Sequence, residues 1–241
     1  MNNSYNERSM KIIDLKKTIL EDNDADADRF REELKKKNVF YMNVMSSPGS
    51  GKTTTIVGTI ERLRKHFNIG VMEADIDSDV DALTVAKAGV SAVQLHTGGM
   101  CHLDADMSRQ GMAALEAEAD NTLDFIILEN VGNLVCPAEF DTGACLNVAI
   151  LSVPEGDDKP LKYPLMFEKC QAVIINKIDS MPAFDFDMDK VKANIAMRNS
   201  EAVVFFVSAR TGEGMDVWCE WLKGNVAQYL GVNQNGQCKS N

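Results

Sequence analysis

Apolar residues gather into seven short runs along the chain, and longer amphipathic stretches separate them. The runs are Val39–Met45, Ile69–Met72, Ala92–Leu95, Phe125–Leu128, Asn147–Val153, Ala172–Ile175 and Ala202–Val207. Short, nearly continuous apolar runs are typical of strands that are buried on both faces of a parallel sheet. The pattern therefore predicts a mostly parallel sheet.

The stretches between these runs show the spacing of amphipathic helices, with apolar residues three or four positions apart. The predicted helices are Thr54–His66, Ala82–Gly89, Leu103–Ala119, Phe186–Asn199 and Met215–Leu230. Strands that alternate with helices predict an α/β fold with helices on both faces of the sheet. A chain of 241 residues is long enough for one such domain, which we expect over residues 39–230.

Both ends of the chain are polar. Residues 1–38 are highly charged, with helical spacing in Met10–Leu20, an acidic run over Glu21–Asp28 and a second helical segment over Arg29–Lys37. We expect this arm to form exposed helices that pack loosely on the domain. The last segment, residues 231–241, is predicted to be a disordered tail.

Charge and composition narrow the function classes. The formal net charge of −11 argues against nucleic acid as a partner, because phosphate backbones attract basic surfaces. No stretch resembles a signal peptide or is apolar enough to span a membrane, so we expect a cytoplasmic protein without a membrane partner. The six cysteines are widely scattered, which favours free thiols or metal ligands over a disulfide framework.

The strongest chemical signal lies where the first apolar run ends. A glycine-rich turn leads there into a predicted helix, and this context predicts a loop that binds nucleotide phosphates through backbone N–H groups. The residues of this loop are Pro48, Gly49, Ser50, Gly51, Lys52, Thr53 and Thr54. Lys52 is expected to reach the β- and γ-phosphates, and the Thr53 hydroxyl to bind Mg²⁺. Ser46 stands where such loops usually open with glycine.

Two later strand ends specify the base. Asn176-Lys177-Ile178-Asp179 follows one strand, and Ser208-Ala209-Arg210 follows the next. A carboxylate at Asp179 can accept paired hydrogen bonds from guanine, whereas adenine offers no such pair, so the motif predicts GTP and GDP as ligands rather than ATP. The Lys177 stem is expected to lie along the base, and Asn176 to tie its loop to the phosphate loop.

The residues after a further strand, Glu129–Gly132, are predicted to form a switch, which is a segment that changes position with the bound nucleotide. Glu129 is expected to hold Mg²⁺, directly or through water, and the Gly132 N–H to sense the γ-phosphate. Asp75 ends another strand and is predicted to join the Mg²⁺ shell or to position water. The predicted catalytic residues are Lys52, Asp75, Glu129 and Gly132.

Cys136 lies four residues beyond Gly132, so movement of the switch must also move this thiol. Cys101 and His102 occur at another strand-to-helix junction on the same edge of the predicted sheet. Two thiols and an imidazole suit Ni²⁺ or Zn²⁺, although three ligands leave a tetrahedral site one short. The missing ligand would be water or a residue across a dimer. The alternative is that both cysteines are small buried core residues.

Taken together, these motifs resemble the HypB family of nickel-incorporation GTPases, which belong to the SIMIBI class of P-loop NTPases. The resemblance covers Val39 to about Leu222. It rests on SSPGSGKTT from Ser46, CHLDADM from Cys101, ENVGNLVCPA from Glu129, SVPEGDDKPLKYP from Ser152 and NKID from Asn176. Ser46 is normal for this family.

The resemblance implies a GTP-dependent homodimer that helps to deliver Ni²⁺ to [NiFe]-hydrogenase. It also implies that Cys101, His102 and Cys136 bind metal at the dimer interface, and that the partners are other maturation proteins and the hydrogenase large subunit. This sequence lacks the N-terminal cysteine motif and the histidine tract of some members. Ala74 and Thr84 also differ from the residues usual in the family. The alternative function is a nickel GTPase for another metalloenzyme, such as urease.

Overall fold

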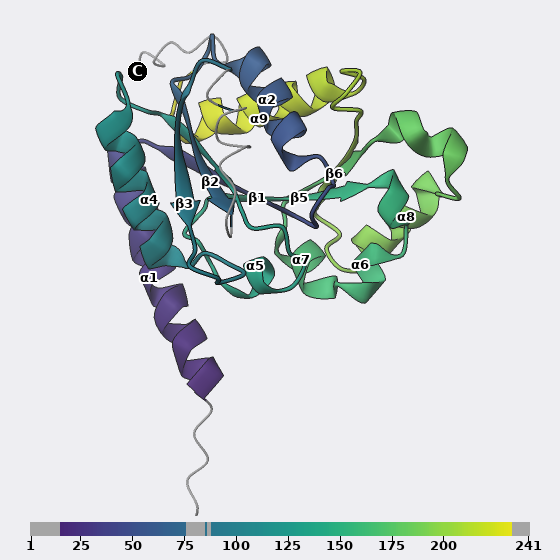
Figure 1. The fold of residues 1–241 in the computed structure, drawn as a ribbon, viewed down its shortest axis with the longest axis horizontal. Coiled ribbons are helices and arrows are strands. Elements are labelled where there is room, and N and C mark those ends of the chain that lie inside the picture. Colours follow the sequence, from purple (N-terminus) through teal and green to yellow (C-terminus); the bar gives the residue numbers. More distant parts are fainter. Residues whose placement is uncertain (1–14, 76–84, 86–87, 233–241) are drawn as a thin grey trace, which may run out of the picture.

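A parallel sheet of seven strands forms the centre of the computed structural model, which describes residues 15–75, 85 and 88–232 (Figure 1). The strands are β1 (Phe40–Ser46), β2 (Ile69–Asp75), β3 (Ser91–His96), β4 (Phe125–Glu129), β5 (Leu146–Ser152), β6 (Ala172–Asn176) and β7 (Val203–Phe206). Their order is β3-β2-β4-β1-β5-β6-β7. Each predicted strand is confirmed, and the parallel pairing is as expected.

β1 lies at the centre of this sheet, between β4 and β5. All seven of its residues are buried, which is the reason that it is mostly apolar, with Asn43 and Ser46 as its two polar residues. Val44 is in register with Glu129, and Glu73 of β2 is in register with the same Glu129. Because the strands are parallel, their carboxyl ends share one edge, and the loops after β1, β4 and β6 begin there.

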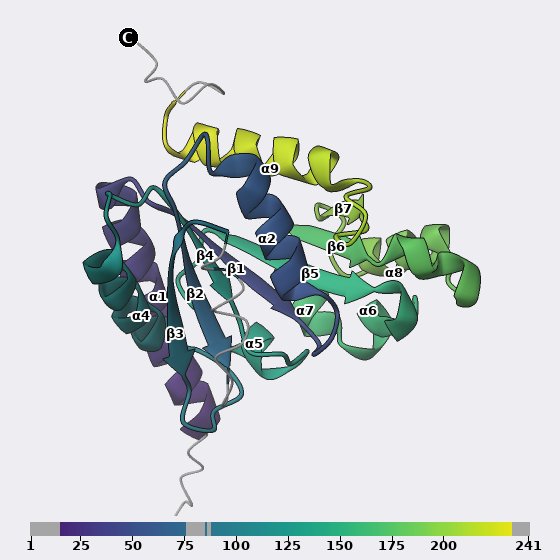
Figure 2. The same cartoon turned by 45° about the horizontal axis from the view of Figure 1, so that its top comes forward.

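Helices cover both faces of the sheet. The larger helices are α1 (Leu15–Lys37), α2 (Lys52–Leu63), α4 (Ala105–Glu118), α8 (Met188–Ala196) and α9 (Met215–Tyr229). α2 and α9 pack over one face, where Ile60 and Trp218 share a core with Val148 (Figure 2). α1, α4 and α8 pack on the other face. The helices predicted between residues 54 and 230 are confirmed, except that 82–89 lies mostly outside the described residues.

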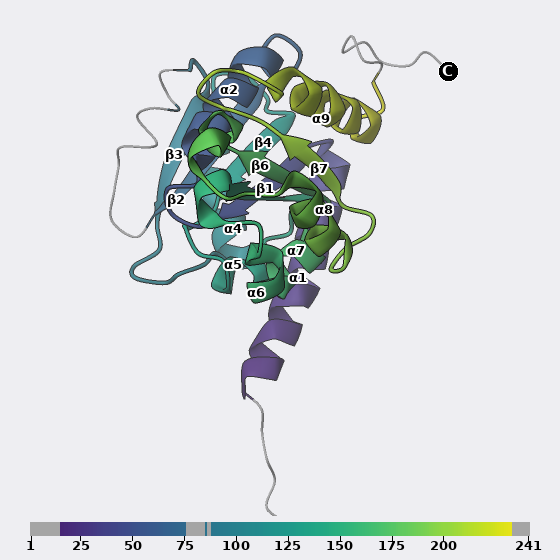
Figure 3. The same ribbon diagram turned by 90° about the vertical axis from the view of Figure 1, so that its right-hand side faces the viewer.

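The N-terminal arm differs from the expectation of loosely packed, exposed helices. One continuous helix, α1, spans Leu15–Lys37, and residues 10–14 of the predicted first helix lie outside the description. Ala27, Phe30 and Leu34 are fully or nearly fully buried against the domain. These three residues form a narrow apolar stripe in an otherwise highly charged helix, so the sequence of this segment suggests an exposed helix. Figures 1 and 3 show the first turns of α1 extending beyond the rest of the molecule.

The charged segment that follows β5, Pro154–Pro164, is bounded by prolines and contains short helices. These are η1 (Val153–Glu155), α6 (Lys159–Lys162) and α7 (Pro164–Lys169), and two further short helices elsewhere are α5 (Cys136–Glu139) and η2 (Ile178–Ala183). Proline is compatible with the first turn of a helix, where its missing N–H has no intrahelical partner. Pro160 and Pro164 occupy such positions, so they begin these helices rather than prevent them.

Candidate functional site

The loop between β1 and α2 has the backbone geometry of a phosphate-binding loop. Gly49 and Gly51 have φ of 74° and 93°, a region in which residues with a Cβ are strained. A Cβ on Gly51 would also lie 2.5 Å from the Asn176 side-chain nitrogen. Lys52 begins α2 and is 8% exposed, so its ammonium group faces the loop rather than solvent.

Ser46 has a role in this loop that its sequence position did not indicate. Its hydroxyl oxygen accepts hydrogen bonds from Lys52 Nζ at 3.0 Å and from the Ser50 hydroxyl at 2.6 Å. Ser46 itself donates to the Ser47 carbonyl at 2.8 Å. A glycine at this position would provide none of these contacts, so Ser46 orients the lysine of the loop.

The residues predicted to hold Mg²⁺ lie together beside this loop. The Thr53 hydroxyl donates to Glu129 Oε1 at 2.9 Å. Glu73, which is not in the predicted set, is 3% exposed and lines the same cavity of about 600 Å³ as Lys52 and Glu129. Hydroxyl and carboxylate oxygens are the donors that Mg²⁺ takes, so these residues fit the ion. Asp75 ends β2 at the same edge, and its predicted role stays a prediction.

The base-recognition loops are tied to the phosphate loop by hydrogen bonds. Asn176 Nδ2 donates to the Ser50 carbonyl at 2.9 Å, and Asn176 Oδ1 accepts from the Ala209 N–H at 3.1 Å. Lys177 Nζ donates to the Gly49 carbonyl at 2.6 Å. These bonds hold the base-recognition loops at a fixed distance from the phosphate loop.

Asp179 is held in place at the far end of this site. Its Oδ1 accepts from the Ser208 hydroxyl at 2.7 Å, and Arg210 Nε lies 3.9 Å from its Oδ2. Asp179, Arg210 and Lys177 line a cavity of about 590 Å³, which shares Gly51, Thr54 and Lys177 with the phosphate-side cavity. The two cavities therefore form adjoining parts of one site large enough for a nucleotide.

The switch segment lies directly against the phosphate loop. A Cβ on Gly132 would be 3.1 to 3.3 Å from Pro48 atoms, so the two backbones are in close contact. Asn130 is fully buried, and its Nδ2 donates to Asn43 Oδ1 at 3.0 Å. Asn43 Nδ2 in turn donates to Asn147 Oδ1 at 3.0 Å. This row of three amides joins the switch to β1 and β5.

Cys101 and Cys136 approach each other beside the switch, and both thiols are partly exposed. A hydrogen bond with Cys101, together with burial, raises the pKa of Cys136. The His102 ring lies 4.0 Å from the Cys101 sulfur and stacks on the Phe140 ring, with centroids 3.6 Å apart. Burial lowers the pKa of His102, which favours the neutral imidazole that metals bind. Within the described part of the chain, no group of three or more such side chains is arranged to hold a metal ion.

Comparison with known proteins places this arrangement in a family. The family described as CobW/HypB/UreG, nucleotide-binding domain, matches residues 40–206. The hydrogenase maturation factor HypB of Rhizobium leguminosarum bv. viciae is 44% identical over 218 residues, which are 90% of this chain and 72% of that protein. The chain belongs to the HypB family.

Two Helicobacter proteins extend the comparison to nearly the full length of a relative. The hydrogenase/urease maturation factor HypB of Helicobacter hepaticus is 42% identical over 95% of this chain and 97% of that protein. The crystal structure of HypB from Helicobacter pylori in complex with nickel aligns with a TM-score of 0.80 at 38% identity, over 91% of this chain and 99% of that one. This HypB-family chain is thus a nucleotide-binding P-loop NTPase.

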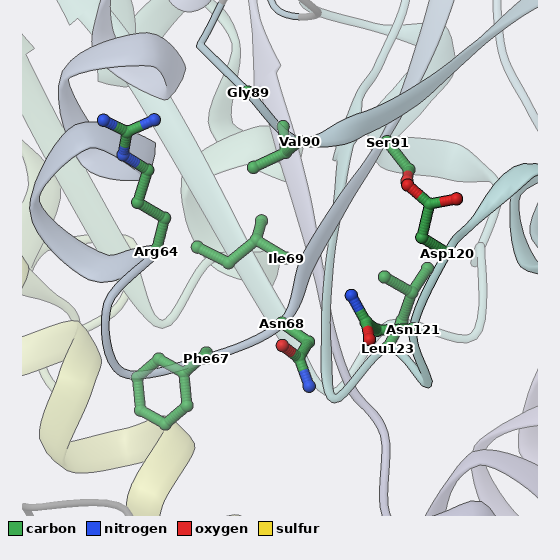
Figure 4. A pocket seen from close by; sticks show the side chains of 10 residues that line it. All are labelled: Arg64, Phe67, Asn68, Ile69, Gly89, Val90, Ser91, Asp120, Asn121 and Leu123. Atoms are coloured by element: carbon green, nitrogen blue, oxygen red, sulfur yellow. The ribbon is translucent and has the colours of Figure 1, made fainter.

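A separate cavity of about 360 Å³ lies at the opposite edge of the sheet, where β2 and β3 begin (Figure 4). Figure 4 shows Arg64 and Asp120 on opposite sides of it. Arg64 donates to the Ala88 carbonyl at 2.8 Å. Since the nucleotide loops of this HypB-family chain are at the other ends of these strands, this cavity is not part of their site.

No helix in the described residues is long and apolar enough to cross a membrane.

Proposed function

We propose that this chain hydrolyses GTP to GDP and phosphate in order to gate nickel delivery into [NiFe]-hydrogenase during its maturation. The observation that carries the proposal is the short path between the two ends of the switch. Gly132 contacts Pro48 of the phosphate loop, and Cys136, four residues further on, lies close enough to Cys101 for that thiol to raise its pKa. A change at the γ-phosphate therefore has only a short segment to move before it reaches the thiol pair.

At the phosphate end, Lys52 would leave its bond with Ser46 to meet the β- and γ-phosphates. Thr53 and Glu129 would hold Mg²⁺ with Glu73 beside them, and the bound ion would neutralise charge on the phosphate oxygens. The Gly132 N–H would bond the γ-phosphate and lose that bond on hydrolysis. Asp75 is the candidate to position the attacking water.

At the base end, we infer selection of guanine by Asp179, with Ser208, Ala209 and Arg210 around it. The test is Asp179→Asn, which should move the preference from GTP toward xanthosine triphosphate, because an amide replaces one acceptor oxygen by a donor. Affinities for the two nucleotides are measured by competition with a fluorescent analogue. Retained preference for GTP in this variant would contradict the base assignment.

At the other end of the switch segment from the phosphate loop, we propose that Cys101, His102 and Cys136 bind Ni²⁺, with Zn²⁺ as a competing ion. The site would be completed by water or by a second copy in a GTP-dependent homodimer. Two exposed apolar residues support the dimer, since Met100 (44% exposed) and Val135 (48% exposed) immediately precede the two cysteines. We place this exchange in the cytoplasm, with other maturation proteins and the hydrogenase large subunit as partners.

The nickel site is tested by Cys101→Ser and Cys136→Ser, with Cys145→Ser as the matched control. Cys145 is also partly buried, but its thiol donates to the Tyr41 carbonyl, away from the switch. Equilibrium dialysis should show weaker Ni²⁺ binding in the first two variants and unchanged binding in the control. Equal affinities in all four proteins would refute the ligand assignment.

A second target, urease, is favoured by one observation. The Helicobacter hepaticus relative, 97% of which this chain covers, is named a hydrogenase/urease maturation factor. Deleting the coding sequence in the source organism and measuring both enzyme activities, with and without added nickel, separates the targets. Loss of hydrogenase activity alone supports the first proposal, and loss of urease activity supports the second.

A further inference from the structure

A buried asparagine in α1 joins the two segments that carry the cysteines. Asn23 Oδ1 accepts a hydrogen bond from the Ala105 N–H at 3.0 Å, and Asn23 Nδ2 donates to the Asp141 carbonyl at 3.0 Å. Ala105 follows His102 by three residues, and Asp141 directly follows Phe140, on which the His102 ring stacks. One side chain therefore contacts the chain just after His102 and just after Phe140, beside both segments of the candidate metal site.

The two partners of Asn23 need a side chain that both accepts and donates hydrogen bonds, as an amide does. The Ala105 N–H belongs to the first turn of α4, where backbone donors have no intrahelical acceptor. Asp104 caps the Met107 N–H of this turn at 2.8 Å, and Asn23 caps the Ala105 N–H. The other partner is a carbonyl, which needs a donor. Only a side chain with both a donor and an acceptor serves the two partners together.

Further contacts hold α1 against residues 141–144, so the position of Asn23 relative to this segment is well defined. Arg31 pairs with the Asp141 carboxylate, and its Nε donates to the Ala144 carbonyl at 3.0 Å. A Cβ on Gly143 would lie 2.6 Å from Phe30, so this turn packs tightly on the helix. Leu103, which lies between His102 and the start of α4, is buried in the same apolar cluster as Phe30.

Packing on the other side of Asn23 is incomplete. A cavity of about 300 Å³ lies between Leu20 and Asp24 of α1 and Glu139 and Phe140 of the switch-linked segment. Apolar contact therefore does not fill the whole space between the helix and this segment. The hydrogen bond from Asn23 to Asp141 is placed to fix the segment where packing does not.

We propose that Asn23 is a positioning residue for the metal site, and that α1 is a working part of that site rather than a separate arm. This inference rests on the proposed metal role of Cys101, His102 and Cys136. Asn23 sets the distance between the Cys101–His102 segment and the Cys136–Phe140 segment. Residues that orient metal ligands without touching the metal typically change metal affinity by about 10- to 100-fold when replaced.

The test measures binding of Ni²⁺ alone to the full chain by competition with a chromogenic chelator, together with thiolate-to-nickel charge-transfer absorption. Asn23→Leu removes both hydrogen bonds, and Asn23→Asp retains the acceptor but removes the donor. Leu34→Ala is the control, because it loosens the same helix at a buried position in the apolar cluster without touching Asn23. We expect about tenfold weaker nickel binding in Asn23→Leu, a smaller loss in Asn23→Asp and less than about twofold loss in Leu34→Ala.

Guanine-nucleotide affinity is measured in parallel and should be unchanged in both Asn23 variants, which shows that the domain is folded. Unchanged nickel affinity in both Asn23 variants would overturn the positioning role, as would an equal loss in Leu34→Ala. The proposed function is judged separately by Cys101→Ser and Cys136→Ser. If these keep wild-type nickel affinity, the metal assignment itself is wrong and the role of Asn23 falls with it.

Discussion

The row of three amides, Asn43, Asn130 and Asn147, allows a quantitative prediction. Asn43→Ala removes two hydrogen bonds of 3.0 Å, one to Asn130 and one to Asn147. Asn130 is fully buried, so its freed donor loses a partner without gaining water, which costs about 1–3 kcal/mol. Asn147 is partly exposed and can be solvated, so losing that bond costs about 0.5–1 kcal/mol. The variant should thus be about 1.5–4 kcal/mol less stable.

Urea unfolding of wild type, Asn43→Ala, Asn147→Ala and the double variant measures this cost and separates its parts. Residues in one hydrogen-bond network show coupling energies of about 0.5–3 kcal/mol. The double variant should therefore lose less free energy of unfolding than the sum of the single variants. Strictly additive losses, or a loss below about 0.5 kcal/mol in Asn43→Ala, would refute the network.

Three further outcomes follow from local geometry. Gly51→Ala forces a side chain onto φ of 93° beside a neighbouring amide 2.5 Å away, so we expect at least about 100-fold weaker nucleotide binding, whereas Gly224→Ala in open space on α9 should leave binding unchanged by calorimetry. Burial raises the pKa of Asp124 to about 6, so its ionisation lowers stability as pH rises from about 4 to about 6. After allowance for its partial exposure, Asp124→Asn should be about 1 kcal/mol more stable than wild type at pH 7.5 and nearly equal at pH 4, as measured by thermal unfolding. Thr53→Ala removes the hydroxyl bonded to Glu129, and a titration of GTP hydrolysis with Mg²⁺ should show a higher Mg²⁺ requirement.

Much of the fold was predictable because the parallel strands are buried on both faces. Such strands are mostly apolar, and β1 and β4 are therefore visible as runs without any knowledge of their neighbours. The loops at the carboxyl edge were equally visible, since binding phosphates and a base requires particular residues at fixed spacing after a strand. Phosphate, base and switch residues do meet at one edge of the sheet in the structure.

The missed features depend on contacts between distant parts of the chain. Asn43 reads as a polar defect in an apolar strand until Asn130 and Asn147 are placed beside it. Asn23 lies in an acidic run that suggests an exposed helix, and its partners come from residues more than 80 positions later. Nothing local in the sequence marks such pairings, because each depends on how strands and helices pack.

The central claim is that nucleotide state and metal affinity are linked through the segment between Gly132 and Cys136. It is tested most directly by the Ni²⁺ dissociation constant of the full chain, measured with a non-hydrolysable GTP analogue and with GDP, each with Mg²⁺. Coupling between sites typically changes affinity by about 5- to 150-fold and must be reciprocal. We predict at least about a fivefold difference in the wild-type chain that disappears in Cys136→Ser. Equal nickel dissociation constants in the two nucleotide states of the wild-type chain would contradict the account.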